Sequence, residues 1–197
     1  MTALPLRQLY YDGQAQAASS NRTFQSIDPA TGAPIADIHE ASLADADRAV
    51  QSAAKAFPAW AATPPAQRAR ILQRAAQLLR ERNDDIATAE TVDTGKAFSE
   101  TSVVDVASGA DVLEYFANLV GSGGLNGETT QLRDDAWVYT KKAPVGVCVG
   151  IGAWNYPIQM YLSPSVMSVT MIVLIRQCPL EVGALSRRRQ HHGLQAK

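Results

Sequence analysis

The sequence predicts an α/β fold, and three observations support this. Between positions 8 and 38, short segments rich in β-branched and aromatic residues alternate with turn residues. From 42 to 119, apolar residues recur at the spacing of one helix face. From 143 to 159 the chain reads APVGVCVGIGAWNYPIQ, with a β-branched residue at every second position from 145 to 151. Such alternation with small residues predicts a strand buried on both faces, as in a parallel sheet.

The N-terminal part is expected to contain strands followed by a helix. Three short strands are expected at 8–13, 23–27 and 34–38. The sequence DPATG at 28–32 predicts a turn, because proline and glycine stand where a β-turn favours them. Ser42 is placed to cap the first helix, which is expected to end at Pro58.

Three more helices are expected before residue 120. The second begins at Pro64 and Pro65, since proline suits the first turn of a helix. The third, 85–94, stops at Gly95, which suits a left-handed cap. The fourth spans 101–119. Its inward-facing residues are expected to be Val103, Val106, Ala110, Leu113 and Phe116.

A glycine-rich crossing and one strand are expected after the helices. Four glycines occur within 121–127, which predicts a flexible connection. Residues 131–142 alternate as a strand, with Trp137 and Tyr139 on one face and Val138 on the other. From the alternation alone, an ordinary edge hairpin fits this segment.

Composition excludes several classes of function. The 197 residues are 46% hydrophobic and carry a formal net charge of −1, so a nucleic-acid partner is not expected. Cys148 and Cys178 form no zinc or disulfide pattern. The longest apolar run, 166–175, is too short to span a membrane, and the N-terminus lacks a signal-peptide pattern. A cytoplasmic protein without a membrane partner is therefore expected.

The turn after the buried strand carries candidate chemistry. Gly152 and Ala153 allow another backbone or a flat ligand to approach closely. The Asn155 carboxamide is placed to donate a hydrogen bond to a developing oxyanion, worth about 3–4 kcal/mol in a dry site. Alternatively, Asn155 ties the turn to its own backbone, a common role for asparagine and the one that local chemistry favours.

Several separate motifs carry a family resemblance. The segments GIGAWNYPIQ and ETVDTGKAFSET, together with those at 23–38, 70–84 and 106–120, make the chain similar to the NAD(P)-dependent aldehyde dehydrogenase superfamily. It most closely resembles the bacterial betaine aldehyde dehydrogenases, from about residue 9 to 159.

The resemblance implies a domain plan. It implies the N-terminal part of an aldehyde dehydrogenase fold, with an incomplete variant Rossmann NAD-binding domain and part of an oligomerisation arm. Residues 1–120 correspond to strands and helices of the cofactor-binding domain, and 121–142 to the linker and an arm strand that pairs between subunits. Residues 143–159 correspond to the first buried strand and the WNYP turn. A homo-oligomer is therefore expected.

The resemblance also implies a cofactor and a substrate. The cofactor is NAD, or alternatively NADP, with its nicotinamide beside Gly152, Ala153 and Trp154. Asn155 is the implied oxyanion donor. Tyr156 corresponds to one ring of a cage that holds the quaternary ammonium group of betaine aldehyde by cation–π attraction.

A potassium site is implied as well. Its ligands are the main-chain carbonyls of Ser26 and Ile27 and the Asp93 carboxylate, which are the hard oxygens that an alkali cation requires. Alternatively, Asp93 hydrogen-bonds its own loop.

The chain departs from the family after Gln159. Ser163 and Pro164 replace a tryptophan and a lysine, and Cys178 replaces a lysine that holds the cofactor ribose, whereas the matching Glu181 is kept. Residues 160–197 are therefore interpreted as an aberrant, frame-shifted tail.

The family's nucleophilic cysteine and general-base glutamate have no counterpart in this chain. The expected function is that of a betaine aldehyde dehydrogenase, with this chain alone inactive. One alternative is a non-catalytic remnant or subunit-binding fragment. Another is a dehydrogenase for a different small aldehyde.

Overall fold

A computed structural model gives the structure of residues 6–160 and 172–174. These residues form a mixed α/β structure, which confirms the predicted fold class. Within them the strands pair in four separate two-stranded ladders. The principal hydrophobic core of the described part therefore lies between helices.

The first hairpin corrects one predicted strand. Strand β1 (Leu9–Tyr11) pairs antiparallel with β2 (Gln14–Gln16). Between them Asp12 and Gly13 both have positive φ, at 55° and 75°. An Asp-Gly loop favours this geometry in a two-residue hairpin, so the strand expected at 8–13 ends early and folds back.

The second hairpin is formed by the two other predicted strands. Strand β3 (Thr23–Ile27) pairs antiparallel with β4 (Pro34–His39), with a register shift between Ser26 and Ile27. The predicted turn at 28–32 is present, and the Gly32 N–H donates to the Asp28 carbonyl at 2.8 Å. Both strands and their turn are confirmed.

Helix α1 (Leu43–Ala62) begins as expected and ends later than expected. The Ser42 side chain accepts from the Asp45 N–H, and the Asp45 carboxylate accepts from the Ser42 N–H. This reciprocal capping box satisfies two backbone donors. Pro58 lies inside the helix, so its predicted end was wrong. A proline removes one backbone bond and kinks a helix, but it does not always end one.

Helices α2 (Pro65–Glu81) and α5 (Val106–Gly121) pack along one another and supply a hydrophobic core cluster. Small side chains allow this approach, since a Cβ on Gly121 would lie 3.1 Å from the Ala69 Cβ. The cluster consists of Ala76 and Leu113 with Leu72, Ala75, Leu79 and Phe116 packed against them.

The fourth predicted helix is interrupted at its start. It comprises α4 (Phe98–Glu100), the π-helical turn η1 (Thr101–Asp105) and then α5. Val106, Ala110 and Leu113 are buried as predicted, but Val103 is 71% exposed. The wider π turn shifts the helix face before α5, so the helical spacing that placed Val103 inward does not hold there.

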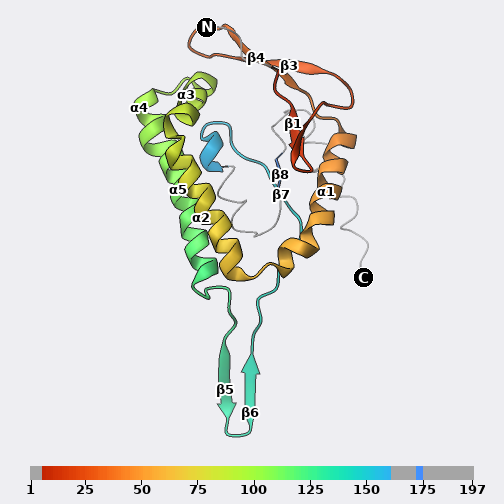
Figure 1. The fold of residues 1–197 in the computed structure, drawn as a ribbon, viewed down its shortest axis with the longest axis vertical. Helices are drawn as coiled ribbons and strands as arrows, with labels where there is room; N and C mark the ends of the chain where they lie inside the picture. The colour runs from red at the N-terminus through yellow and green to blue at the C-terminus, as the bar shows by residue number, and fades with distance from the viewer. Residues whose placement is uncertain (1–5, 161–171, 175–197) are drawn as a thin grey trace, which may run out of the picture.

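The single strand expected at 131–142 is instead a hairpin. Strand β5 (Thr129–Arg133) pairs antiparallel with β6 (Ala136–Tyr139) around Asp134 and Asp135. The Trp137 and Tyr139 side chains are both exposed. This hairpin projects from one end of the molecule (Figure 1).

The strand expected to be buried is short and largely uncovered. Only β7 (Cys148–Gly150) is a strand in this region, and it pairs in parallel with β8 (Ile172–Leu174). Val145, Val149 and Ile151 are all more than half exposed, so burial on both faces was a wrong prediction for the described part. A strand is buried only by elements that cover it, and alternation alone does not supply them.

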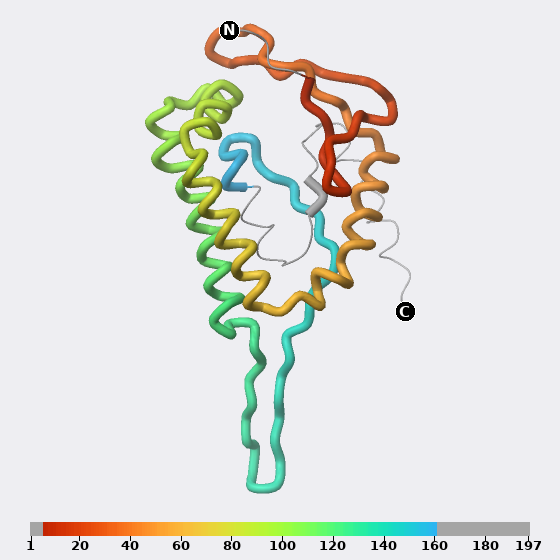
Figure 2. The backbone as a smooth tube through the Cα atoms, in the orientation of Figure 1, coloured from red at the N-terminus to blue at the C-terminus, as the bar shows by residue number. Residues whose placement is uncertain are grey.

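Two groups of helices flank the strands. Helices α2, α4, α5 and α3 (Asn83–Thr94) gather on one side and α1 on the other, with β7 and β8 between them (Figure 1). The chain rises from the β5–β6 hairpin between the two groups and reaches residues 157–160 near α3 (Figure 2). No helix among the described residues is long and apolar enough to cross a membrane. Cys178, Glu181 and most of the predicted tail lie outside the described residues.

Candidate functional site

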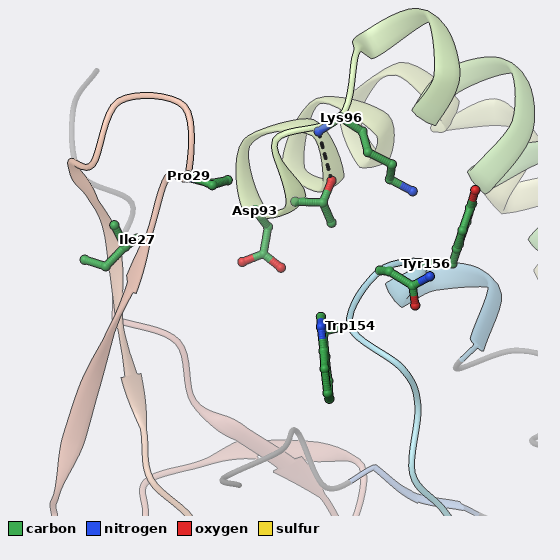
Figure 3. A pocket seen from close by; sticks show the side chains of 8 residues that line it. Ile27, Pro29, Asp93, Lys96, Trp154 and Tyr156 are labelled. Atoms are coloured by element: carbon green, nitrogen blue, oxygen red, sulfur yellow. Dashed lines mark hydrogen bonds between the residues drawn. The ribbon is translucent and has the colours of Figure 1, made fainter.

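A pocket of about 500 Å³ lies where three segments meet (Figure 3). The segments are the end of β3 with its turn, the end of α3 with the following loop, and the turn at 154–156. The pocket is lined by Ile27, Pro29, Asp93, Thr94, Lys96, Trp154, Asn155 and Tyr156. Five predicted site residues therefore line one cavity, whereas Ser26, Gly152 and Ala153 lie outside its lining.

Gly95 joins two walls of the pocket. It caps α3 with φ 78°, as the sequence predicts. A Cβ at this position would lie 2.8 Å from the Pro29 Cγ, closer than side-chain carbons approach one another. Glycine is therefore required here both by the left-handed backbone and by the packed Pro29 ring. The loop after Gly95 then directs the Lys96 side chain toward the turn that carries Tyr156 (Figure 3).

The predicted potassium ligands lie together. The Ser26 hydroxyl donates to the Asp93 carboxylate at 2.9 Å, which joins β3 to the end of α3. Asp93 points into the space between Ile27 and Trp154 (Figure 3). Ile27 pairs with Pro34, which has no N–H to donate, and the ladder shifts register at this point. These oxygen-bearing groups fit a hard cation, and the described residues hold no cluster of three or more histidine, cysteine, aspartate or glutamate side chains for another metal.

A second group of charges lies beside Tyr156 and was missed by the sequence reasoning. The Lys96 ammonium lies 3.9 Å from the centroid of the Tyr156 ring. It also forms an ion pair with the buried Asp105 and lies 3.9 Å from a carboxylate oxygen of Glu90. We call Glu90, Lys96 and Asp105 the charge cluster. Glu90 stands three residues after the fully buried Ala87, and this acidic position on a buried helix face was the available signal.

Burial dominates the electrostatics of Glu90. Its side chain is almost fully enclosed, and burial, followed by the negative charge of Asp105, raises the pKa of Glu90 to about 7. Lys96 and a hydrogen bond from the Ile158 N–H act in the opposite direction. Glu90 therefore contacts the backbone of the segment that follows Asn155.

Asn155 and Trp154 present their side chains to solvent at the pocket. Trp154 is 77% exposed. No hydrogen bond joins the Asn155 carboxamide to any other residue that the structure describes, so no bond of the turn-bracing kind is found there. Its N–H groups are therefore open to a ligand on the pocket side.

Comparisons with known proteins agree on one family. A model of the aldehyde dehydrogenase family matches residues 16–171. Indole-3-acetaldehyde dehydrogenase of P. syringae, solved in complex with NAD+ and IAA, is 32% identical over 84% of this chain, with a TM-score of 0.78. Gamma-glutamyl-gamma-aminobutyraldehyde dehydrogenase of Burkholderia cenocepacia is 31% identical over 84%, with a TM-score of 0.79.

A third structure covers more of the chain. PnpE in complex with nicotinamide adenine dinucleotide is 28% identical over 95% of this chain, with a TM-score of 0.78. The chain spans 39% of the length of that structure and 34% of each of the other two.

Proposed function

Because this chain belongs to the aldehyde dehydrogenase family, we propose that its pocket is part of a site that oxidises an aldehyde with NAD, or alternatively NADP. The observation that carries the proposal is that Trp154, Asn155 and Tyr156 line the same cavity as the end of α3. The cofactor accepts a hydride from the substrate carbon in such a reaction. The exposed Trp154 and the small residues Gly152 and Ala153 leave room for a flat nicotinamide ring at the entrance.

Asn155 is the proposed oxyanion donor. Addition of a nucleophile to an aldehyde carbon converts its carbonyl oxygen into an alkoxide. The Asn155 N–H groups have no partner among the described residues, so they need not break a protein hydrogen bond to donate to that oxygen. A pre-positioned donor of this kind favours the transition state over the ground state.

The proposed substrate is betaine aldehyde. Its quaternary ammonium group suits an aromatic ring, and Tyr156 lines the pocket together with the carboxylate of Asp93. One observation favours another, uncharged small aldehyde: Lys96 already places a cation on the Tyr156 ring. A second cation must then use the remaining ring surface against the repulsion of the first.

Two assembly features complete the proposal. Ser26, Ile27 and Asp93 hold a potassium ion that joins β3 to α3 and so fixes one pocket wall. The β5–β6 hairpin pairs with another copy of the chain in a homo-oligomer, because it exposes Leu132, Trp137 and Tyr139 on a strand pair that projects from the molecule.

Turnover is the direct test of Asn155. Because the chain spans 34% of the P. syringae enzyme, residues 6–160 replace the matched segment of that enzyme in a hybrid, and NADH formation is measured. Asn155→Ala is expected to lower kcat and kcat/KM together by roughly a hundredfold, with NAD affinity unchanged. Asn155→Asp nearly keeps the shape and replaces the donor with a charge. Full turnover in the Asp variant would end the proposal.

The same hybrid separates the two substrate classes. Betaine aldehyde is compared with its uncharged analogue, in which a carbon replaces the nitrogen and the shape is nearly identical. If Tyr156 holds the cation, kcat/KM for betaine aldehyde should be higher by about tenfold, and Tyr156→Leu should remove the difference. An equal or lower value for betaine aldehyde would favour the uncharged aldehyde.

A further inference from the structure

We propose that the charge cluster of Glu90, Lys96 and Asp105 positions the turn that carries Asn155 by holding it at two points against helix α3 and the π turn η1. This inference rests on the proposed function, since it concerns how the proposed oxyanion donor is fixed. None of the three residues needs to touch the substrate, so all three are positioning residues.

The two points of attachment lie just after Asn155 in the chain. Lys96 contacts the face of the Tyr156 ring, with 3.9 Å between its ammonium nitrogen and the ring centroid. This is well inside the roughly 6 Å over which a cation and a ring attract each other. Glu90 accepts a hydrogen bond from the Ile158 N–H. One contact therefore holds a side chain and the other holds the backbone.

Among the described residues, few hydrogen bonds other than those of the cluster fix the turn. The Trp154 side chain is mostly exposed, and the Asn155 carboxamide has no hydrogen bond to another described residue. Residues 157–160 are helical, and the Met160 N–H donates to the Tyr156 carbonyl at 2.9 Å. That bond lies inside the segment, so it does not tie the segment to the rest of the protein.

The cluster is itself held rigidly. The Asp105 side chain is fully buried at the end of η1, and it pairs with the Lys96 ammonium. The Lys96 side chain is only 17% exposed, which limits the positions its ammonium can take. The Lys96 N–H also donates to the Thr94 hydroxyl at 3.4 Å, which holds the loop (Figure 3).

The hydrogen bonding of the cluster differs from that of a group that serves stability alone. The buried carboxyls of Glu90 and Asp105 share a side-chain hydrogen bond, and one oxygen of each has no other hydrogen-bond partner among the described residues. Leaving a buried acceptor unpaired costs stability, and a well-packed apolar set would avoid that cost. Contact with the 156–158 segment explains why charged groups occupy this place.

The chain contains its own reporters for a test. Its three tryptophans lie in separate places: Trp60 in α1, Trp137 in the β5–β6 hairpin and Trp154 in the turn. Fluorotryptophan incorporated into the full chain gives one fluorine NMR resonance for each, and Trp154→Phe assigns the one from the turn. Spectra recorded without NAD report the position of the turn, and NADH formation by the hybrid tests the proposed function separately.

The central variant is Lys96→Met with Asp105→Asn, which removes both members of the ion pair and leaves Glu90 as the one ionisable side chain of the cluster. The Trp154 resonance is expected to shift and broaden, whereas those of Trp60 and Trp137 stay in place. Lys96→Arg, which keeps the cation, is expected to restore the Trp154 resonance. Lys55→Met on the exposed face of α1 is the matched control and should change no resonance except through direct proximity to Trp60.

Two outcomes would overturn the proposal. An unchanged Trp154 resonance in the double variant, with a lowered melting temperature, would show that the cluster only stabilises the fold. Equal changes at all three tryptophans would show a global effect without a specific link to the turn. If the Lys96 variants move the Trp154 resonance but the hybrid described above forms no NADH from any aldehyde, the proposed function fails and the attachment of the turn is retained.

Discussion

Replacing Gly95 by alanine tests the junction between the two walls of the pocket. Gly95 has φ 78°, and a Cβ there would lie 2.8 Å from the Pro29 Cγ and 3.6 Å from the Pro29 Cβ. Gly32 provides a matched control, because its φ is 70° and a Cβ there would meet nothing within 4 Å. Both substitutions force alanine into a left-handed backbone conformation, which costs free energy. Only Gly95→Ala also brings the new methyl group into a steric clash with Pro29.

The expected magnitudes follow from these two terms. A left-handed backbone at a non-glycine residue costs roughly 1–2 kcal/mol, so Gly32→Ala should lower the free energy of unfolding by that amount. Overpacking against a ring that cannot turn away costs about 1–3 kcal/mol more. Gly95→Ala should therefore lower the free energy of unfolding by about 2–5 kcal/mol.

A double-mutant cycle in urea isolates the collision. Pro29→Ala removes the Cγ and leaves the Cβ at 3.6 Å from the new methyl group, an ordinary contact. The Gly95→Ala and Pro29→Ala variant should be more stable than the sum of the single effects by about 1–3 kcal/mol. Equal losses for Gly95→Ala and Gly32→Ala, or additivity within about 0.5 kcal/mol in the cycle, would refute the packing of Gly95 on Pro29.

Three further predictions concern Glu90, Asp93 and the hairpin. The pKa of Glu90 is raised to about 7 in the folded protein, so its contribution to stability is fully present below about pH 4.5 and is lost as the pH rises through 7. Thermal unfolding from pH 5 to 7 should therefore show a larger fall in melting temperature for the native chain than for Glu90→Gln, and parallel pH profiles would contradict the shifted pKa. Potassium chloride should raise the melting temperature above the value in the same concentration of lithium chloride, and Asp93→Asn should abolish the difference whereas Asp85→Asn should keep it. Trp137→Ser should lower the oligomeric state measured by sedimentation, and an unchanged distribution would argue against the hairpin as an interface.

Local chemistry made some elements predictable. The capping box at Ser42, the left-handed cap at Gly95 and the turn at 28–32 each depend on a few neighbouring residues, and all three are present. The candidate site followed from motifs that carry a family resemblance. Five of its residues line one pocket, although their chemical roles remain predictions.

Other features depend on contacts between distant segments, and sequence spacing does not contain them. Pro58 is accommodated inside α1, and Val103 is exposed because η1 changes the helix face. Val149 alternates as a buried strand residue does, yet burial depends on what covers the strand. The contact between Lys96 and Tyr156 joins residues sixty positions apart, so no local pattern announces it.

The π turn η1 runs directly into helix α5, so it sets how the two parts of this helical segment are rotated relative to each other about their common axis. At its first residue, the Thr101 hydroxyl contacts Thr91 and the Ala87 carbonyl, and downstream of it Leu113 faces α2. Adding one residue to 102–104, which the wide turn does not take up without a second bulge, would rotate these two parts by about 100° relative to each other. Only one of the two contacts could then be kept. Sequence length across this turn is therefore constrained more tightly than sequence identity, even at a position as exposed as Val103.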